Sequence, residues 1–516
     1  MADVGGRFMR FLGLDVGTTS VKAAVFDENG GLCGYGRRNY HVLFLDGQRA
    51  QQDACGVWEH AKESIIEATR EEKRIDAISI SVQGDAIIPV GYDRRPLYDC
   101  LLGMDYRAEA QSSQCEQKLG AERLFKLTGM RPHPLNSLSK ILWFEQERPE
   151  LAERIWKYMT YEDFFLMKLG VESPVVDLTM ASRYMALDLL SGEWSEEILG
   201  AIGLSESKLS HPCQTGSLVG ELSDVLAKEL GLHPKVPIIA GGHDQTCGAL
   251  GAGMTQNDGG ALDSHGTAEV LSAAFDEPRL TTRMFSSYYP CTRYAQNNRF
   301  FTFALNHTGG VLFQWFLEAF CEKDMEMAKL KNEDPFAYMI ARIPMDRPSA
   351  VLALPHFNGR GTPRCDLQSK GAFAGLTMHT TREEMLKAII DALAYEMKLN
   401  LAAFKEAGVH VSTIRCVGGA AKSEDWLQLK ADVLNVPVET LKTREAACLG
   451  AAMLAAIGSG VYSSLEQAAR NMVHVHCRYI PIPERNERYE KSFAIYSKLY
   501  DALKEIHHAM GEGSNT

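Results

Sequence analysis

A short polar segment between two apolar runs has the residue types that bind phosphate. It reads Gly17-Thr18-Thr19-Ser20, with Asp15 just before it and Lys22 just after it. A glycine at a hairpin tip lets backbone amides approach a phosphate closely, and the neighbouring hydroxyls and the lysine add donors. The Asp15 carboxylate is a hard oxygen ligand, so we predict that it is linked to Mg²⁺. An ordinary hairpin turn is the alternative interpretation. The predicted phosphate contacts here are Thr18, Thr19, Ser20 and Lys22.

A second tip of the same kind follows later in the chain. Residues 260–264 lead into His265-Gly266-Thr267, and an apolar run resumes at residues 268–274. We predict that Gly266 and Thr267 also contact phosphate. The repetition of strand, glycine–threonine tip and strand predicts two related domains that face each other across a cleft.

A carboxylate at the end of a predicted strand has the properties of a general base. The segment reads Gly241-Gly242-His243-Asp244-Gln245. Transfer of a phosphoryl group to an alcohol needs a group that accepts the hydroxyl proton, and Asp244 fits that role. Gln245 can hold a neighbouring hydroxyl. A helix N-cap is the alternative role for Asp244, and both roles can hold at once. For His243 we expect a structural role.

Two further segments have residues suited to a nucleotide. Gly418-Gly419-Ala420 ends a predicted strand, and such small residues let a flat base or a ribose lie against the backbone. By itself this motif is weak evidence. The segment with Gly310 and Gln314 either lines the nucleotide or forms a turn before a buried helix.

The elements that position these residues alternate between strands and helices, which predicts an α/β fold. Aromatic residues spaced through the last 30 or so residues predict an amphipathic C-terminal helix from residue 485, packed on the body. Strands are expected at 11–14, 21–26, 75–82, 87–90, 236–240 and 413–417, and helices at 58–70, 109–127, 139–144, 149–157, 161–169, 426–434 and 446–457.

Composition narrows the class of protein. The chain has 516 residues, which predicts more than one domain, and its 45% hydrophobic and 23% charged residues are ordinary for a globular enzyme. The net charge of -12 argues against binding to nucleic acid or to an anionic membrane. We expect no signal peptide and no membrane span. The 12 cysteines show no metal spacing, which favours reduced thiols and a cytoplasmic protein.

Taken in order, these motifs resemble the FGGY family of carbohydrate kinases over nearly the whole chain. The segments that carry the resemblance are DVGTTSVKAAVFDENG, QRAQQDACGVWE, KVPIIAGGHDQTCGALGAG, LDSHGTAEVL, CVGGAAKSEDWLQLKADVLNVPV and EAACLGAAMLA. The resemblance implies two actin-like (ribonuclease H-like) domains around a cleft that binds ATP and sugar. It implies a sugar-binding domain at 1–255 and a nucleotide-binding domain with the C-terminal helix at 256–516.

The implied reaction is Mg²⁺-dependent transfer of the ATP γ-phosphate to a hydroxyl of a small sugar, with Asp244 as general base. Carried over by position, Gly418, Gly419 and Ala420 become adenosine contacts, whereas Gly310 and Gln314 match nucleotide contacts more loosely. Members of the family are often dimers, so the resemblance allows a homodimer.

The substrate segment departs from the family patterns. Xylulose kinases have Q-M-H and glycerol kinases have Q-R-E where this chain has Gln83-Gly84-Asp85. Asp85 can accept hydrogen bonds from sugar hydroxyls, and Gly84 is expected to widen the pocket. The MDYRA segment resembles the family's W-x-D-x-R segment without its tryptophan. The texture is closest to xylulose and gluconate kinases, so we expect a ketose, a sugar acid or a polyol. The predicted substrate contacts are Gln83, Gly84, Asp85, Asp105, Asp244 and Gln245.

Three other functions fit parts of this pattern. An actin-type or chaperone-type ATPase shares the two phosphate tips, but it has no need for an aspartate placed to activate an alcohol. A catalytically silent sugar-binding regulator is disfavoured because Asp15, Thr18, Asp244 and Gly418 are all present. A kinase that phosphorylates a signal molecule cannot be separated from a metabolic kinase by sequence.

Overall fold

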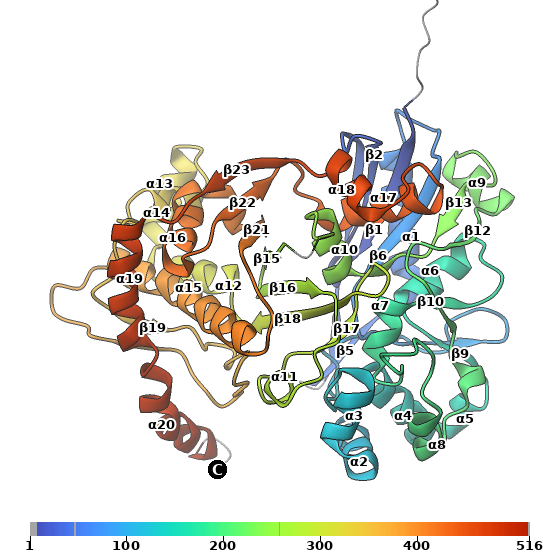
Figure 1. The fold of residues 1–516 in the computed structure, drawn as a ribbon, viewed down its shortest axis with the longest axis horizontal. Coiled ribbons are helices and arrows are strands. Elements are labelled where there is room, and N and C mark those ends of the chain that lie inside the picture. Colours follow the sequence, from blue (N-terminus) through green and yellow to red (C-terminus); the bar gives the residue numbers. More distant parts are fainter. Residues whose placement is uncertain (1–7, 46–47, 257, 514–516) are drawn as a thin grey trace, which may run out of the picture.

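The computed structural model describes residues 8–45, 48–256 and 258–513. Its ribbon forms two lobes, with the first half of the chain in one lobe and most of the second half in the other (Figure 1). Each lobe is built on a sheet of seven strands. The predicted α/β class with two related halves is confirmed. Among the described residues, no helix is both long and apolar enough to span a bilayer.

The first sheet begins with the predicted hairpin. β1 (Arg10–Val16) pairs antiparallel with β2 (Ser20–Asp27), which pairs antiparallel with β3 (Leu32–Asn39). On its other side β1 pairs in parallel with β6 (Ala77–Val82). The path continues to β13 (Pro237–Ile239) and β12 (Leu218–Glu221), and β14 (Gly242–His243) pairs with the end of β6.

The second sheet repeats this order. β15 (Gly260–His265) pairs antiparallel with β16 (Glu269–Phe275), which pairs antiparallel with β18 (Phe300–Asn306). β15 also pairs in parallel with β21 (Thr413–Gly418), and β21 pairs in parallel with β22 (Val438–Leu441). The edges are β17 (Thr292–Arg293) and β23 (Val475–Tyr479). The two tips predicted from sequence therefore occupy equivalent turns.

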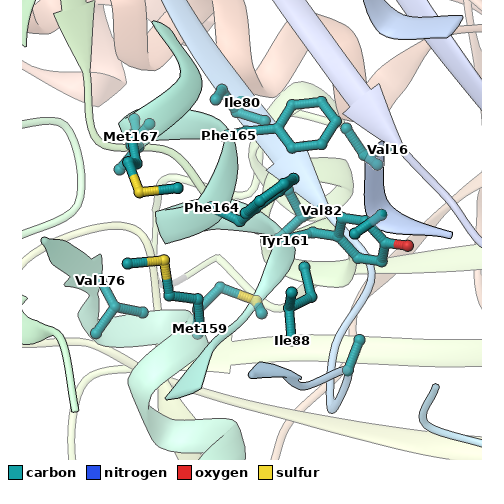
Figure 2. Close-up of a cluster of buried hydrophobic side chains, with 14 of the residues drawn as sticks. Val16, Ile80, Val82, Ile88, Met159, Tyr161, Phe164, Phe165, Met167 and Val176 are labelled. Carbon is teal, nitrogen blue, oxygen red and sulfur yellow. The ribbon is translucent and has the colours of Figure 1, made fainter. Parts of the chain in front are cut away.

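The inner strands of the first sheet are buried, which explains their apolar sequences. Every residue of β6 is buried. α6 (Tyr161–Leu169) begins at a capping box formed by Thr160 and Asp163. Side chains of α6 lie close to residues of β1 and β6 in one apolar cluster (Figure 2). Burial of aromatic side chains is the main favourable term that holds such a layer in place. The strand ends that carry the site therefore stand on a rigid base.

Two helices from late in the chain lie on the first sheet. α17 (Ala446–Gly458) packs across β1 and β6, and α18 (Leu465–Met472) packs against α17 (Figure 1). α17 also packs closely against α10 (Asp244–Gly251). A Cβ at Gly251 would lie 1.8 Å from the Ala446 carbonyl oxygen, and a Cβ at Gly450 would lie 1.9 Å from the Cys247 carbonyl oxygen. The helices cross this closely because both positions are glycine. The domain boundary at 255/256 stays a prediction.

Three helix predictions need correction. Residues 149–157 form the short α5 (Pro149–Ala152) and then the strand β9 (Ile155–Met159), because these residues pair with β7 (Ile88–Gly91). Residues 109–127 form α2 (Glu109–Leu119) and α3 (Ala121–Thr128), which are interrupted at Gly120 with φ of 79°. The C-terminal segment forms α19 (Pro483–Tyr496) and α20 (Leu499–Gly513), and its predicted aromatic packing is confirmed at Tyr489, Tyr496 and Tyr500.

The remaining elements connect and cover the two sheets. In the first half they are β4 (Leu43–Leu45), β5 (Arg49–Gln52), α1 (Ala54–Ala68), β8 (Cys100–Leu101), α4 (Ser137–Glu147), β10 (Val175–Asp177), α7 (Leu178–Ala181), η1 (Ser182–Tyr184), α8 (Glu196–Ile202), η2 (Glu206–Lys208), β11 (His211–Cys213) and α9 (Asp224–Leu230). In the second half they are α11 (Thr282–Ser286), α12 (Gly310–Phe320), α13 (Glu322–Leu330), α14 (Pro335–Ile340), β19 (Leu352–Leu354), β20 (Ala372–Ala374), α15 (Arg382–Glu406), η3 (Ala420–Lys422) and α16 (Glu424–Leu434).

Candidate active site

Two glutamine side chains form hydrogen bonds with the first tip. The Thr18 hydroxyl donates to Gln83 Oε1 over 3.0 Å, and Gln52 donates through its side-chain amide to the Thr18 carbonyl oxygen over 2.5 Å. Tyr40 donates its hydroxyl to the Gly17 carbonyl oxygen. The Thr19 side chain is exposed, and Ser20 begins β2. Of the predicted substrate contacts, Gln83 therefore binds the tip in this structure.

Asp15 and Lys22 lie directly opposite each other on β1 and β2. Ser81 donates its hydroxyl to Asp15 Oδ1 over 3.1 Å, while the Lys22 ammonium lies 3.6 Å from Asp15 Oδ2. The same ammonium lies 2.9 Å from Glu445, just before α17. Burial raises the pKa of Asp15, and Lys22 and Ser81 only partly offset that rise. Burial disfavours the Lys22 charge, but the two carboxylates outweigh it and raise its pKa. Lys22 thus links Asp15 to Glu445 at the N-terminus of α17.

Asp244 is the first residue of α10, at the end of β14. Its side chain is 29% exposed, so it is accessible yet largely removed from water. Burial and the nearby charge of Asp15 raise the pKa of Asp244 to about 7, and Gln245 and Arg183 only partly lower it. Gln245 Oε1 is buried and has no hydrogen-bond partner among the described residues. A carboxylate with a pKa near neutrality can accept a proton at physiological pH.

The expectation that Gly84 widens a pocket is wrong. A Cβ at Gly84 would lie 2.7 Å from His243 Nε2 and 3.4 Å from Arg183 Nε. The imidazole and the guanidinium therefore fill the space that a side chain at position 84 would take. Sequence alone could not show this, because residues 84 and 243 meet only when β14 pairs with β6.

Asp85 forms a buried ion pair that sequence reasoning did not predict. Its Oδ2 lies 2.7 Å from Arg183 Nη2, while its Oδ1 is buried without a partner among the described residues. Its backbone has φ of 64°, and its carbonyl oxygen accepts a hydrogen bond from Lys140 over 2.8 Å. Burial lowers the pKa of Lys140 to about 8, although Asp85 opposes this change. The sequence offers one signal for Arg183, because it is the only charged residue between Asp177 and Asp188.

Asp105, in the loop between β8 and α2, is fully buried. Its carboxylate accepts the backbone amide of Ala50 over 2.8 Å and is bound by the Arg107 guanidinium at 2.7 Å and 2.8 Å. Because the carboxylate is enclosed by these partners, we correct the prediction that it contacts substrate. The structure gives Asp105 a positioning role for the loop between β8 and α2.

The second tip borders a cavity of about 1000 Å³ in the second lobe. Phe313, Phe336 and Ile340 give it apolar walls. This combination of apolar walls with a few polar groups is typical of a ligand pocket. Five of the predicted nucleotide contacts line it: Gly266, Thr267, Gly310, Gln314 and Gly419. Ala420 starts η3 in the loop beside them.

Gly418 ends β21 and is the one position of this motif where glycine is required. Its φ is 91°, and a Cβ there would lie 2.3 Å from the His265 carbonyl oxygen. At Gly419 the corresponding distance is 3.8 Å, which is ordinary contact. Gly418 lines a neighbouring cavity of about 540 Å³. The loop turns sharply at Gly418 and leaves open space beside Gly419.

A buried charge cluster lies beneath the second tip. Among the described residues, Asp263, His265 and Glu269 lie close enough together to hold a metal ion. The Lys430 ammonium lies 2.6 Å from Glu269 Oε1 and also contacts Asp263. Burial opposes ionisation of Glu269, but Lys430 and His265 outweigh it and hold its pKa at about 2. Lys430 thus supplies the positive charge of this group.

The comparisons with known proteins show the family of the chain. Sequence models for the N-terminal and C-terminal domains of the FGGY family of carbohydrate kinases match residues 10–251 and 261–459. The chain is 27% identical over 504 residues to a xylulose kinase of Bacillus subtilis, covering 97% of this chain and 98% of that one. It is 27% identical over 508 residues to a gluconokinase of the same organism, covering 96% of each.

A solved xylulose kinase from Lactobacillus acidophilus has the same fold. It superimposes with a TM-score of 0.87 at 24% identity, over 97% of this chain and 100% of that chain. The two domain models together run from β1 to the end of α17, so they include both tips, Asp244 and the loop at Gly418. The chain belongs to the FGGY family of carbohydrate kinases.

Proposed function

We propose that the protein transfers the γ-phosphate of ATP to a hydroxyl of a small sugar or polyol, with Asp244 accepting the hydroxyl proton. The observation that carries this proposal is the environment of Asp244. Its carboxylate is partly exposed and has a pKa of about 7. A general base works best when its pKa lies near the working pH, because it is then often ionised yet still basic.

The nucleotide fits the pocket of the second lobe. The apolar walls accommodate a base, and the backbone at Gly266 and Gly419 allows close approach of a ribose and phosphates. The exposed Thr267 hydroxyl stands at the second tip, where it can donate to a phosphate oxygen. At the equivalent first tip, the Thr18 hydroxyl would exchange its hydrogen bond to Gln83 for one to phosphate. In such reactions positioning and electrostatic stabilisation supply most of the rate increase. The residues of both tips would hold the phosphate that is transferred.

The chain has carboxylates suited to Mg²⁺. Asp15 has a raised pKa, and its charge also raises the pKa of Asp244. A divalent cation near two such carboxylates relieves this excess of negative charge, and carboxylate oxygens are its preferred protein ligands. We infer that Asp15 holds the ion, directly or through water. When bound, Mg²⁺ neutralises phosphate charge, while Lys22 and Ser81 keep Asp15 in place.

We propose that the acceptor binds beside Asp85 and Arg183. A buried carboxylate paired with a guanidinium offers acceptors and donors to adjacent hydroxyl groups. Relatives named xylulose kinase and gluconokinase match the chain equally well in percentage identity. We therefore propose a ketose such as a pentulose, a sugar acid or a polyol as the acceptor.

All 12 cysteines are free thiols, which supports a reducing compartment such as the cytoplasm.

The alternative of an actin-type or chaperone-type ATPase is not favoured, because both halves match carbohydrate kinases. A silent sugar-binding regulator is not favoured for the same reason. The discriminating experiment measures ADP release with ATP and Mg²⁺ against D-xylulose, D-gluconate, glycerol and further pentuloses and polyols. We expect one acceptor to raise ADP release well above the rate without sugar, and Asp244→Asn to remove the increase. Steady ATP hydrolysis unaffected by every acceptor would contradict the proposal.

A further inference from the structure

His243 is held tightly beside the proposed base. Its backbone amide donates to the Thr179 hydroxyl over 2.9 Å, and its carbonyl oxygen accepts the Thr246 hydroxyl over 2.8 Å. The side chain is 6% exposed, and its Nε2 lies 3.2 Å from Asp244 Oδ1. The main chain on both sides of the imidazole is therefore fixed, and one ring nitrogen lies close to the Asp244 carboxylate.

The charge state of the imidazole follows from its surroundings. Burial, and secondarily the charge of Arg183, lower the pKa of His243 well below its usual value. The ring is therefore neutral and has a single N–H. The charged groups that face it are Arg183 from η1 and Asp244 from α10, and the Phe303 ring of β18 lies 6.4 Å away. A proton on Nε2 places that N–H within 3.2 Å of the Asp244 carboxylate oxygen.

The residue opposite explains why this ring fits. Gly84 lies against Nε2, where a Cβ would approach to 2.7 Å. An alanine Cβ at this distance would force the imidazole ring to move. The Cβ could not shift to the other side, because the buried Arg183 Nε lies 3.4 Å from it there. Gly84 and His243 thus form a matched pair: the glycine makes room for the imidazole, and the imidazole reaches Asp244.

We infer that His243 is a positioning residue for the phosphoryl transfer: its Nε2–H donates to Asp244 Oδ1 and fixes the carboxylate for proton acceptance. The inference rests on the proposed function, because it concerns the orientation of the same base. At 3.2 Å the two atoms lie within donor–acceptor distance but are not aligned as a hydrogen bond in this structure, and catalytic hydrogen bonds are often poorly aligned before substrate binds. The second Asp244 oxygen then remains for the substrate hydroxyl.

Two variants of equal length separate positioning from packing. His243→Gln keeps an N–H donor at a similar reach, whereas His243→Met fills the same space without a donor. With the best acceptor among D-xylulose, D-gluconate and glycerol, we expect His243→Met to lower kcat about 10- to 100-fold and leave the KM for ATP unchanged. We expect His243→Gln to recover most of that loss. Equal losses in both variants would show packing alone and overturn the inference, as would wild-type kcat in both.

A test without any acceptor uses thermal unfolding. His243→Met should lower Tm by several degrees at pH 8, and by much less in an Asp244→Asn background, because the donor then lacks its charged partner. Equal shifts in the two backgrounds would overturn the inference. Gly84→Ala serves as a further variant from the opposite side, since it displaces the ring and should reduce kcat as His243→Met does. If Asp244→Asn itself keeps wild-type kcat, the proposed base is wrong, which is a different failure.

Discussion

The loops that follow β6 in the first half and β21 in the second half leave their sheets at the same point. The backbone amide of Gln83 donates to the Val16 carbonyl oxygen over 2.9 Å. The backbone amide of Gly419 donates to the His265 carbonyl oxygen over the same distance. From that shared start the first loop continues to Asp85 and its ion pair with Arg183. The second continues into η3 beside the large cavity. One backbone arrangement therefore supports a polar loop and a small-residue loop, which we propose bind the hydroxyl groups of the acceptor and the nucleotide, respectively.

The two hairpins differ in the same way. On the first hairpin Asp15 pairs with Lys22, whereas the corresponding pair on the second is Ser264 with Val270. In the second half the charged side chains beneath the tip are fully buried, and Lys430 contacts both Asp263 and Glu269. We propose that the charged residues near the first tip serve the reaction, whereas those beneath the second tip stabilise the fold. The variants below test this difference.

The largest effect on stability is expected beneath the second tip. Lys430→Met leaves two buried carboxylates without their cation, and breaking such a buried pair costs about 3–5 kcal/mol of unfolding free energy. The Lys22 side chain is 26% exposed, so Lys22→Met should cost far less stability and should instead reduce kcat. Chemical denaturation of both variants compares them. Similar losses of stability would contradict the assignment of structural charge to the second half.

A glycine pair sharpens the comparison of the two loops. Gly418→Ala forces a Cβ toward the His265 carbonyl oxygen at 2.3 Å in a left-handed backbone, which costs about 1–3 kcal/mol and distorts the loop. We expect the KM for ATP to rise about tenfold, with the KM for the sugar unchanged. Gly419→Ala is the matched control, because its Cβ has room, and its effect should be smaller. The reverse order would refute the proposed loop geometry.

On the first loop, Asp85→Asn should act on the sugar. The change removes the negative partner of Arg183 while nearly preserving shape, so we expect the KM for the sugar to rise about tenfold. The KM for ATP should stay within about twofold, because Asp85 does not line the nucleotide pocket. Steady-state kinetics with each substrate varied in turn checks both values. A larger effect on ATP than on sugar would remove Asp85 from the acceptor side.

The sequence predicted the features that depend on local patterns. α6 begins and ends where the apolar spacing places it, at residues 161 and 169, and both tips join the strands that flank them. The alternating residues around Tyr158 were misassigned, because only pairing with β7 makes them a strand. In the site, Asp15, Asp244 and Gly418 are readable from motifs. Arg183, Lys430 and the match between Gly84 and His243 arise from contacts between distant segments, which spacing does not reveal.

The smallest expected effect concerns pH and stability. The pKa of Asp244 is raised from 3.8 to about 7 in the folded protein, so its ionisation opposes folding as pH rises through that window. Asp244→Asn should therefore raise Tm, slightly at pH 4.5 and fully above pH 7. Calorimetry across this range gives the difference. A constant Tm difference would show that the carboxylate is not perturbed by burial and Asp15.

The most direct test of the account compares chemistry and nucleotide binding in Asp244→Asn. With the acceptor identified by ADP release, we would measure kcat for the wild type and the variant, and Kd for ATP by calorimetry. The account predicts a fall in kcat of about 10²- to 10⁴-fold with an ATP Kd within about twofold of the wild type. A variant that keeps near-wild-type kcat would contradict the assignment of Asp244 as the base.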